Sequence, residues 1–167
     1  MSVTPAGVNQ NVLLEFFLTF ARFEFALKNA GFFQRPRNID PADPPDARPD
    51  WDCFAASIRQ FLAQDKTPEF VEAYEYLLNH PPAREVLLNG SLMWEAKAPS
   101  AHLPLADRSL QCVRRVRNNL FHGGKFNSVQ DADPARNNRL LQCSMAILRA
   151  CLRASAIVDA HFQAAAL

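Results

Sequence analysis

The chain has 167 residues, of which 49% are hydrophobic and 21% charged, and its 18 lysines and arginines nearly balance 17 aspartates and glutamates. A chain of this size buries enough surface to fold as a single domain over residues 1–167, which excludes the disordered, fibrous and histone-like classes. No apolar run approaches the ~20 residues that span a bilayer and no leader pattern is present, so we expect a cytoplasmic protein without membrane contact.

The spacing of the apolar residues predicts an all-helical protein, because glycine is scarce and the alternation typical of strands is nearly absent. We expect the first helix over about Asn9–Ala30. It should stop at Gly31, a residue suited to the left-handed conformation that follows many helices. Residues 34–50 contain five prolines and are therefore predicted to form a surface loop.

Two further helices are predicted in the middle of the chain. One spans about Asp50–Gln64, and the other begins with Thr67 as its cap and Pro68 in its first turn. This third helix should end before Pro81, because proline cannot continue it. A short helical turn is expected at Ala83–Leu88.

The last third of the chain predicts two long helices. Gly90–Leu105 is expected to be an irregular connection with Trp94 anchored on the core, followed by a helix from near Asp107 to His122. A final helix capped by Asp133 should run to about Phe162, far enough to cross the domain at 1.5 Å per residue. Together these elements predict an up-and-down helical bundle with one proline-rich loop after the first helix.

Cysteine and histidine spacing gives no sign of a metal site. The cysteines form no C-x-x-C pair and are expected to be reduced thiols in the core, and the histidines are scattered along the chain. We therefore expect neither a metal nor another cofactor. The residues concerned are Cys53, Cys112, Cys143, Cys151, His80, His102, His122 and His161.

Positive charge is concentrated in one part of the sequence. Residues 1–107 carry nine basic and fourteen acidic side chains, a net charge of −5, whereas residues 108–153 carry nine basic and two acidic side chains, a net charge of +7. Such a segment is either a solvated helix face or a surface that binds a polyanion. A helical projection predicts that its polar side chains lie on one exposed face, namely those of Arg108, Gln111, Arg115, Asn118, Asn119 and His122.

The first predicted helix carries an acid and a base among aromatic residues. Glu24 and Lys28 lie four residues apart and fall between Phe17, Phe20 and Ala21 in projection. They either form an ion pair with each other or support a functional site, since charge surrounded by apolar groups requires a partner.

Two segments of the chain resemble the HEPN superfamily of helical nucleotide-binding domains. Residues 117–122, Arg-Asn-Asn-Leu-Phe-His, are similar to its arginine, polar residue and histidine signature, and residues 22–28 resemble the Glu-x(3)-Lys helix of one bacterial branch. The resemblance implies a helical bundle that forms a homodimer with a composite active site. It also implies a metal-independent endoribonuclease of the toxin–antitoxin, phage-defence or RNA-processing kind, with an antitoxin or inhibitor protein as a further partner.

The resemblance also implies roles for individual residues. Arg117, Asn118 and His122 would be catalytic, with the histidine moving a proton and the arginine stabilising charge on the phosphorus oxygens. Glu24 and Lys28 would support them from the first helix. Further polar side chains of the basic segment would bind RNA, namely Arg114, Arg115, Asn119 and Lys125.

Two alternatives remain open at this level. Arg115 competes with Arg117 for the catalytic role, because on an ideal helix Arg115 projects about 20° from His122 and Arg117 about 140°. The second alternative is a catalytically inactive member that binds a nucleotide or RNA, or that serves as a dimer scaffold, since a fold does not establish an activity.

Overall fold

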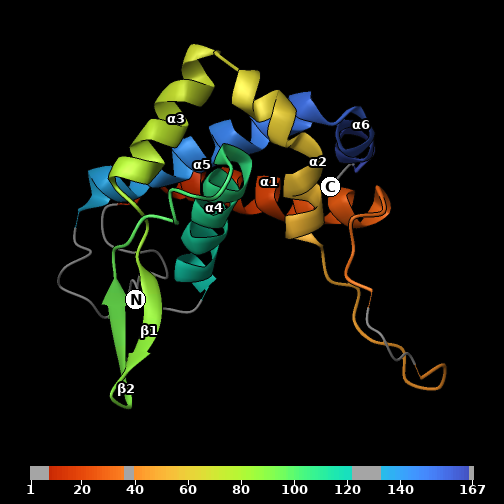
Figure 1. Ribbon diagram of the computed structural model, residues 1–167, viewed down its shortest axis with the longest axis horizontal. Helices are drawn as coiled ribbons and strands as arrows, with labels where there is room; N and C mark the ends of the chain where they lie inside the picture. The colour runs from red at the N-terminus through yellow and green to blue at the C-terminus, as the bar shows by residue number, and fades with distance from the viewer. Residues whose placement is uncertain (1–7, 36–39, 122–132, 166–167) are drawn as a thin grey trace.

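The computed structural model describes residues 8–35, 40–121 and 133–165, and these form six helices and one small sheet (Figure 1). In chain order the elements are α1 (Gln10–Asn29), α2 (Trp51–Gln64), α3 (Pro68–Asn79), β1 (Arg84–Leu88), β2 (Ser91–Glu95), α4 (Leu105–Phe121), α5 (Pro134–Ala154) and α6 (Ala156–Ala164). The sequence predicted an all-helical protein; the structure is mainly helical and also contains a two-stranded sheet.

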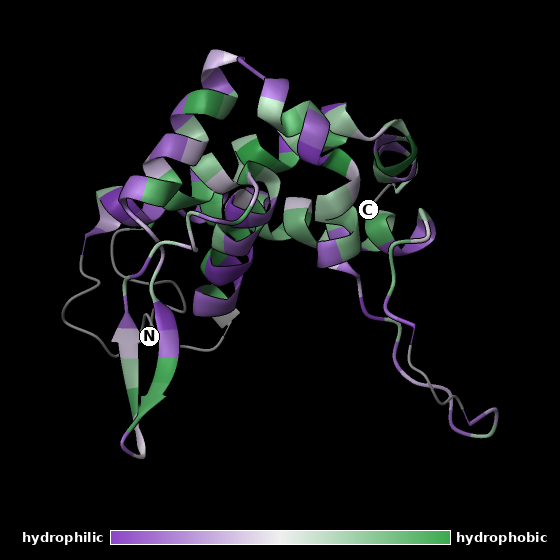
Figure 2. Cartoon of the chain, viewed as in Figure 1, coloured by the Kyte–Doolittle hydropathy of each residue, from purple (hydrophilic) through white to green (hydrophobic). Residues whose placement is uncertain are grey.

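Helix α5 lies at the centre and packs against each of the five other helices in the described part of the chain. Twelve of its 21 residues are buried, so it is enclosed on most of its circumference rather than along a single stripe. Figure 2 shows apolar residues gathered where the helices face one another and polar residues on their outer sides. The core therefore surrounds α5, and helices α1 to α4 and α6 form its shell.

An aromatic cluster joins α1 to α2. The Trp51 ring stacks on Phe20 and Phe23, with ring centroids 5.4 Å and 5.6 Å away, and Phe54 meets Phe23 edge to face at 5.6 Å. All four side chains are at most 5% exposed. Burial of aromatic rings of this size is a large stabilising contribution to the α1–α2 contact.

The starts of α1, α2 and α5 follow the local sequence signals, whereas Thr67, the expected cap of α3, makes no side-chain cap hydrogen bond. Asn9 accepts hydrogen bonds from the backbone nitrogens of Asn11 and Val12 at the start of α1, and Gly31 after its end has φ +91°. Asp50 and Asp133 cap α2 and α5 in the same way, so these expected starts are confirmed. Side-chain oxygens at these positions satisfy backbone nitrogens that have no partner within the helix.

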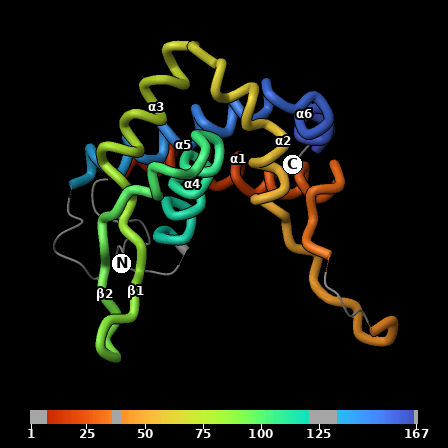
Figure 3. Tube along the Cα trace, viewed as in Figure 1, coloured from red at the N-terminus to blue at the C-terminus, as the bar shows by residue number. Residues whose placement is uncertain are grey.

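The proline-rich segment after α1 is an exposed excursion, as predicted (Figure 3). Its two described legs run beside each other, because Gln34 N donates to Arg48 O at 2.8 Å and Asp50 N donates to Phe32 O at 2.9 Å. The described residues from Gln34 to Arg48 are all exposed. The loop thus leaves and rejoins the helices at one place and contributes little to the core.

The expectation of a helical turn and an irregular connection after α3 was wrong, because these residues form a β-hairpin. Strands β1 and β2 pair antiparallel, with Leu88 opposite Ser91. The two residues between them, Asn89 and Gly90, have φ of +51° and +79°. Asn-Gly between apolar runs is the strongest short hairpin signal, because both residues adopt positive φ at low cost. The prediction from the sequence relied on the lack of strict alternation and did not use this signal.

The single last helix expected up to Phe162 was also wrong, because the chain bends by 115° between α5 and α6. Ser155, at the break, has an extended backbone with φ −139° and ψ 95°. The bend lets α6 pack on α1, where Arg22 Nε donates to Phe162 O at 2.8 Å and its guanidinium lies 4.4 Å from the Phe162 ring centroid. Tertiary contact therefore overrides the helical pattern of the sequence.

No single helix in residues 8–35, 40–121 and 133–165 has the length and apolar character to cross a membrane; only the bent pair of α5 and α6 meets that test jointly.

Candidate functional site

The C-terminal half of α4 carries the arginine-rich motif. Arg117 and Asn118 lie near the end of this helix, which ends at Phe121. Two predicted site residues, His122 and Lys125, lie outside the residues that the structure describes. The described part of the candidate site therefore consists of the α4 side chains and the segments of other elements that contact them.

Arg117 points toward α1. Its guanidinium carbon lies 5.7 Å from the centroid of the Phe20 ring, and its Nη1 donates to Asn118 Oδ1 at 3.2 Å. The side chain is half-buried, so the aromatic face and the neighbouring amide hold a permanent positive charge at the edge of the core. The two adjacent motif residues thus contact each other directly.

Glu24 lies in the same part of α1, one turn after Phe20. Trp51 Nε1 donates to Glu24 Oε1 at 3.4 Å, and the Trp51 ring stacks on Phe20. Arg117, Phe20, Trp51 and Glu24 are therefore linked by a continuous series of contacts between α4, α1 and α2. The first-helix acid and the motif arginine are thus connected through two buried rings.

Lys28 does not pair with Glu24 in the described part of the chain. The carboxylate is held by Trp51, and the half-buried Lys28 side chain has neither a hydrogen bond nor a salt bridge among the described residues. The sequence left two interpretations open, an ion pair between Glu24 and Lys28 or support of a functional site. The two side chains do not form the ion pair.

The three neighbouring arginines of α4 contact three different elements. Arg115 Nη1 donates to Lys97 O at 2.6 Å in the connection before α4. Arg114 faces α2, where its Nη1 lies 3.7 Å from an oxygen of Asp52, a carboxylate that is 95% exposed. Arg117 contacts Phe20 of α1, whereas Arg115 contacts Lys97 in the connection before α4, and this difference distinguishes the two arginines.

Asn119 does not lie on an exposed face, contrary to the sequence prediction. It is 6% exposed, and its Nδ2 donates to Ala83 O at 2.8 Å, just before β1. Its amide satisfies a backbone carbonyl 36 residues away in the chain, a contact that a helical projection cannot show. This contact gives Asn119 a structural role between α4 and the segment before β1.

A second aromatic and basic cluster lies at the end of α3, and the sequence interpretation missed it. The Tyr76 and His80 rings stack with centroids 4.6 Å apart, and the guanidinium of Arg139 lies 5.6 Å from the Tyr76 centroid. Burial raises the pKa of Tyr76. Arg136 Nη2 donates to Pro81 O at 3.1 Å. Pro81 lies two residues before Ala83, whose carbonyl oxygen accepts from Asn119. Tyr76 and His80 are four residues apart, a spacing that places two side chains on one side of a helix, and this pattern could have predicted their contact.

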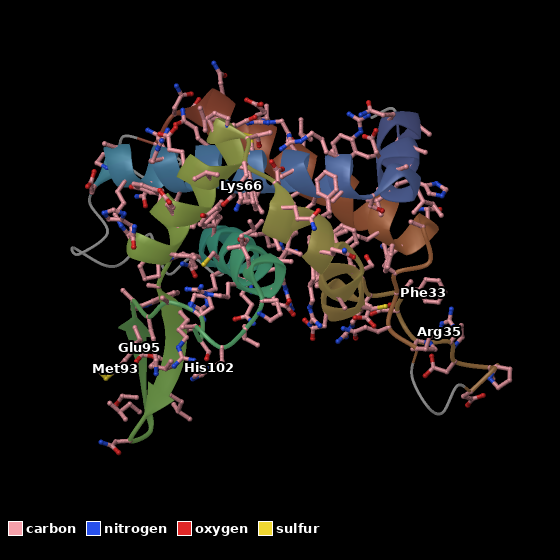
Figure 4. All side chains as sticks on the ribbon, turned by 45° about the horizontal axis from the view of Figure 1, so that its top comes forward. Phe33, Arg35, Lys66, Met93, Glu95 and His102 are labelled. Atoms are coloured by element: carbon pink, nitrogen blue, oxygen red, sulfur yellow. The ribbon has the colours of Figure 1, made fainter. Side chains whose placement is uncertain are left out.

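The cysteines and acidic residues form no further centre in the described residues. No group of three or more histidine, cysteine, aspartate or glutamate side chains comes together in residues 8–35, 40–121 and 133–165. Cys112, Cys143 and Cys151 are buried as expected, but Cys53 is exposed, which corrects that prediction. His102 lies exposed in the connection between β2 and α4, near the base of the hairpin that carries Glu95 (Figure 4).

Comparison with protein-family models, with curated proteins and with solved structures found no match for this chain.

Proposed function

We propose that this protein is a HEPN-type endoribonuclease, built on a HEPN-like helical bundle, that cleaves RNA without a metal ion. The observation that carries the proposal is the contact of Arg117 with Phe20 of α1 and with Asn118. The contact holds a guanidinium beside the amide that the signature requires, in the region of α1 that also carries Glu24. The strongly basic composition of residues 108–153 supports a polyanionic substrate.

The proposed reaction is an internal transesterification. The ribose 2′-oxygen attacks the adjacent phosphorus, the bond from phosphorus to the 5′-oxygen breaks, and the products are a 2′,3′-cyclic phosphate and a 5′-hydroxyl. One His122 accepts the proton of the 2′-hydroxyl, and the protonated His122 of a second copy donates a proton to the leaving oxygen. Protons balance over the two histidines, and no oxidant or reductant is involved.

Arg117 would stabilise the negative charge that develops on the phosphorus oxygens, a role suited to a planar cation that stays ionised. Asn118 would orient this guanidinium, in line with their 3.2 Å hydrogen bond. Glu24 and Lys28 are positioning residues that act from α1. Arg114, whose ion pair with Asp52 is loose and exposed, would bind a flanking phosphate together with Lys125.

The test is incubation of the pure protein with a single-stranded RNA in excess EDTA, followed by analysis of the product ends. We expect cyclic phosphate and 5′-hydroxyl ends, at least 100-fold slower cleavage by the R117A and H122A variants, and no cleavage of DNA of the same sequence, which lacks the 2′-hydroxyl. R115A should lose much less activity than R117A, because its guanidinium is engaged with Lys97 O.

The matched control is R149A, which removes the same charge from an arginine of α5 that pairs with Glu69 on α3. It should cleave at the wild-type rate. Cleavage that persists in both R117A and H122A would remove the site assignment. Tight RNA binding without any cleavage would favour the inactive binding module instead.

A further inference from the structure

The β-hairpin is an apolar arm that the helices of residues 8–35, 40–121 and 133–165 do not cover. Leu87, Leu92, Leu88 and Met93 are 72%, 70%, 53% and 48% exposed. Among the residues that the structure describes, the two strands pack substantially only on each other, and Figure 2 shows apolar residues on both strands between the base of the hairpin and its hydrophilic turn. A hairpin of two strands is at best marginally stable in water unless a third element packs against it.

The register gives the hairpin two apolar faces. Leu87 and Leu92 are directly opposite each other and therefore share one face, and Val86 and Met93 share the other. Met93 lies out along the arm, and Glu95 lies nearer its base, where it pairs with Arg84 (Figure 4). Charge is thus confined to the base, while the outer half offers leucine and methionine to a partner.

Helix α1 carries a second apolar surface without cover in the described chain. Leu14, Leu18, Ala21 and Phe25 are all exposed, and they follow one another at spacings of four, three and four residues. This spacing produces a straight apolar seam along one side of a helix, the pattern found where a helix packs against another apolar element. We call these four residues the α1 seam. The opposite side of α1 packs on α5 and α6.

We propose that the hairpin of one copy packs against the α1 seam of a second copy, and reciprocally, to form a symmetric dimer. One seam covers one face of the hairpin. At ~150–250 Å² for a large apolar side chain, the exposed fractions of Leu87 and Leu92 correspond to about 280 Å², and those of the seam to about 300 Å². Two such contacts bury about 1,150 Å² in total, above the roughly 1,000 Å² expected of a specific interface. One hairpin against one seam in an open chain of copies would bury only half of this per contact.

Charge at the edge of the two surfaces is complementary. Glu85 shares the hairpin face of Leu87 and Leu92, and its side chain forms no ion pair with the described residues. Lys28 follows the seam one turn after Phe25 and is likewise without a salt bridge there. When Leu87 and Leu92 of one copy lie on the α1 seam of the other, Glu85 at the base of the hairpin comes close to Lys28 at the end of α1.

This arrangement also gives the second copy a place at the proposed active site. The hydrogen bond from Asn119 to Ala83 joins the last turn of α4 to the base of the hairpin. When the hairpin docks on the second copy, the end of α4 therefore lies near the α1 helix of that copy. This link rests on the proposed function. The dimer itself does not, because it follows from the two uncovered surfaces.

The first test is the molar mass in solution by sedimentation equilibrium. The wild-type protein should be a dimer of 18.7 kDa chains. The double variant L87E/L92E and the single variant L18E should each weaken dimerisation at least 100-fold, since each would bury an unpaired charge. The control I157E, at an apolar position of α6 that is 54% exposed, should leave the dimer unchanged. A monomeric wild-type protein, or a dimer that tolerates both sets of charges, would overturn the proposal.

The second test identifies the surfaces in contact and does not depend on charge variants that could misfold. In a C53S background, which removes the exposed cysteine, L92C and L18C chains are expressed together and oxidised. A disulfide should join an L92C chain to an L18C chain. Efficient cross-linking of L18C alone, or of L92C alone, would show that α1 meets α1 or hairpin meets hairpin, and would overturn the proposal.

Failure of this interface and failure of the proposed function give different results. A wild-type dimer with the predicted cross-link but no cleavage of RNA would leave the interface in place and remove the nuclease. A monomer that cleaves RNA would do the reverse. If both hold, L87E/L92E should lose both dimerisation and cleavage, while R117A should lose cleavage and remain dimeric.

Discussion

Asn119, in the last turn of α4, donates a hydrogen bond of 2.8 Å to the carbonyl oxygen of Ala83, which directly precedes β1. This one contact fixes the end of the motif helix against the base of the hairpin. It also separates two adjacent asparagines by role, because Asn118 is exposed and accepts from Arg117, whereas Asn119 is buried and serves the backbone.

Replacing Asn119 by alanine should destabilise the protein by about 1–3 kcal/mol, because the Ala83 carbonyl loses its partner in a poorly hydrated position. The measurement is urea unfolding followed by circular dichroism. N118A, at the neighbouring exposed position, should change the free energy of unfolding by less than ~0.5 kcal/mol. If N119A were as stable as wild type but bound RNA more weakly, the structural role assigned to Asn119 would be wrong.

The ion pair between Arg59 on α2 and Asp107 on α4 should make stability depend on pH. Two hydrogen bonds of 2.8 Å from Arg59 hold the pKa of Asp107 below its ordinary value of 3.8. A carboxylate with a lowered folded-state pKa stabilises the fold above the unfolded value, and this contribution is lost as pH falls through the folded value. D107N should therefore cost about 1 kcal/mol at pH 7, since Arg59 is partly exposed.

The difference in unfolding free energy between wild type and D107N should shrink toward zero as the pH falls well below 3.8. Urea titrations at several pH values measure it. D52N is the matched control, because Asp52 is 95% exposed and lies 3.7 Å from Arg114, so its effect should be small at every pH. A D107N penalty that stayed constant down to pH 2 would contradict this account.

One cysteine should react rapidly with iodoacetamide in the folded protein. Cys53 is exposed, whereas burial raises the pKa of the Cys112 thiol to about 11 and also raises the pKa values of Cys143 and Cys151. Thiolate is the reactive form, so the buried thiols are slow at pH 8 through both access and protonation. Intact-mass spectrometry should find one adduct in the native protein, none in C53S and four after unfolding.

The helices could be predicted where their signals are local. Asp133 was predicted as the cap of the last helix and caps α5, and the starts expected near Asn9 and Asp50 agree with α1 and α2, because a cap acts on backbone groups within three residues. The bend at Ser155 could not be predicted in this way. It depends on the contact of α6 with α1, which joins residues about 140 positions apart.

In the candidate site, too, contacts between neighbouring residues could be predicted from the sequence and contacts between distant segments could not. The pairing of Arg117 with Asn118 lies within the motif and follows from adjacency. That Arg117 lies over Phe20 of α1, and that Asn119 turns inward to Ala83, depends on how α4 is rotated against distant segments. An ideal projection gives angles around one helix and contains no information on which neighbouring element lies at each angle.

The central position of α5 also constrains the order in which the chain can fold during translation. Helices α1 and α3 both find a principal packing partner in α5, which the ribosome makes more than a hundred residues after α1 begins. Until residues 134–154 emerge, the buried side of α1, with Phe16, Phe20 and Phe23, has no α5 against which to pack. During most of its synthesis the nascent chain therefore has only the Trp51 and Phe54 rings of α2 to cover this aromatic side of α1, a period in which chaperone binding would have the greatest effect on yield.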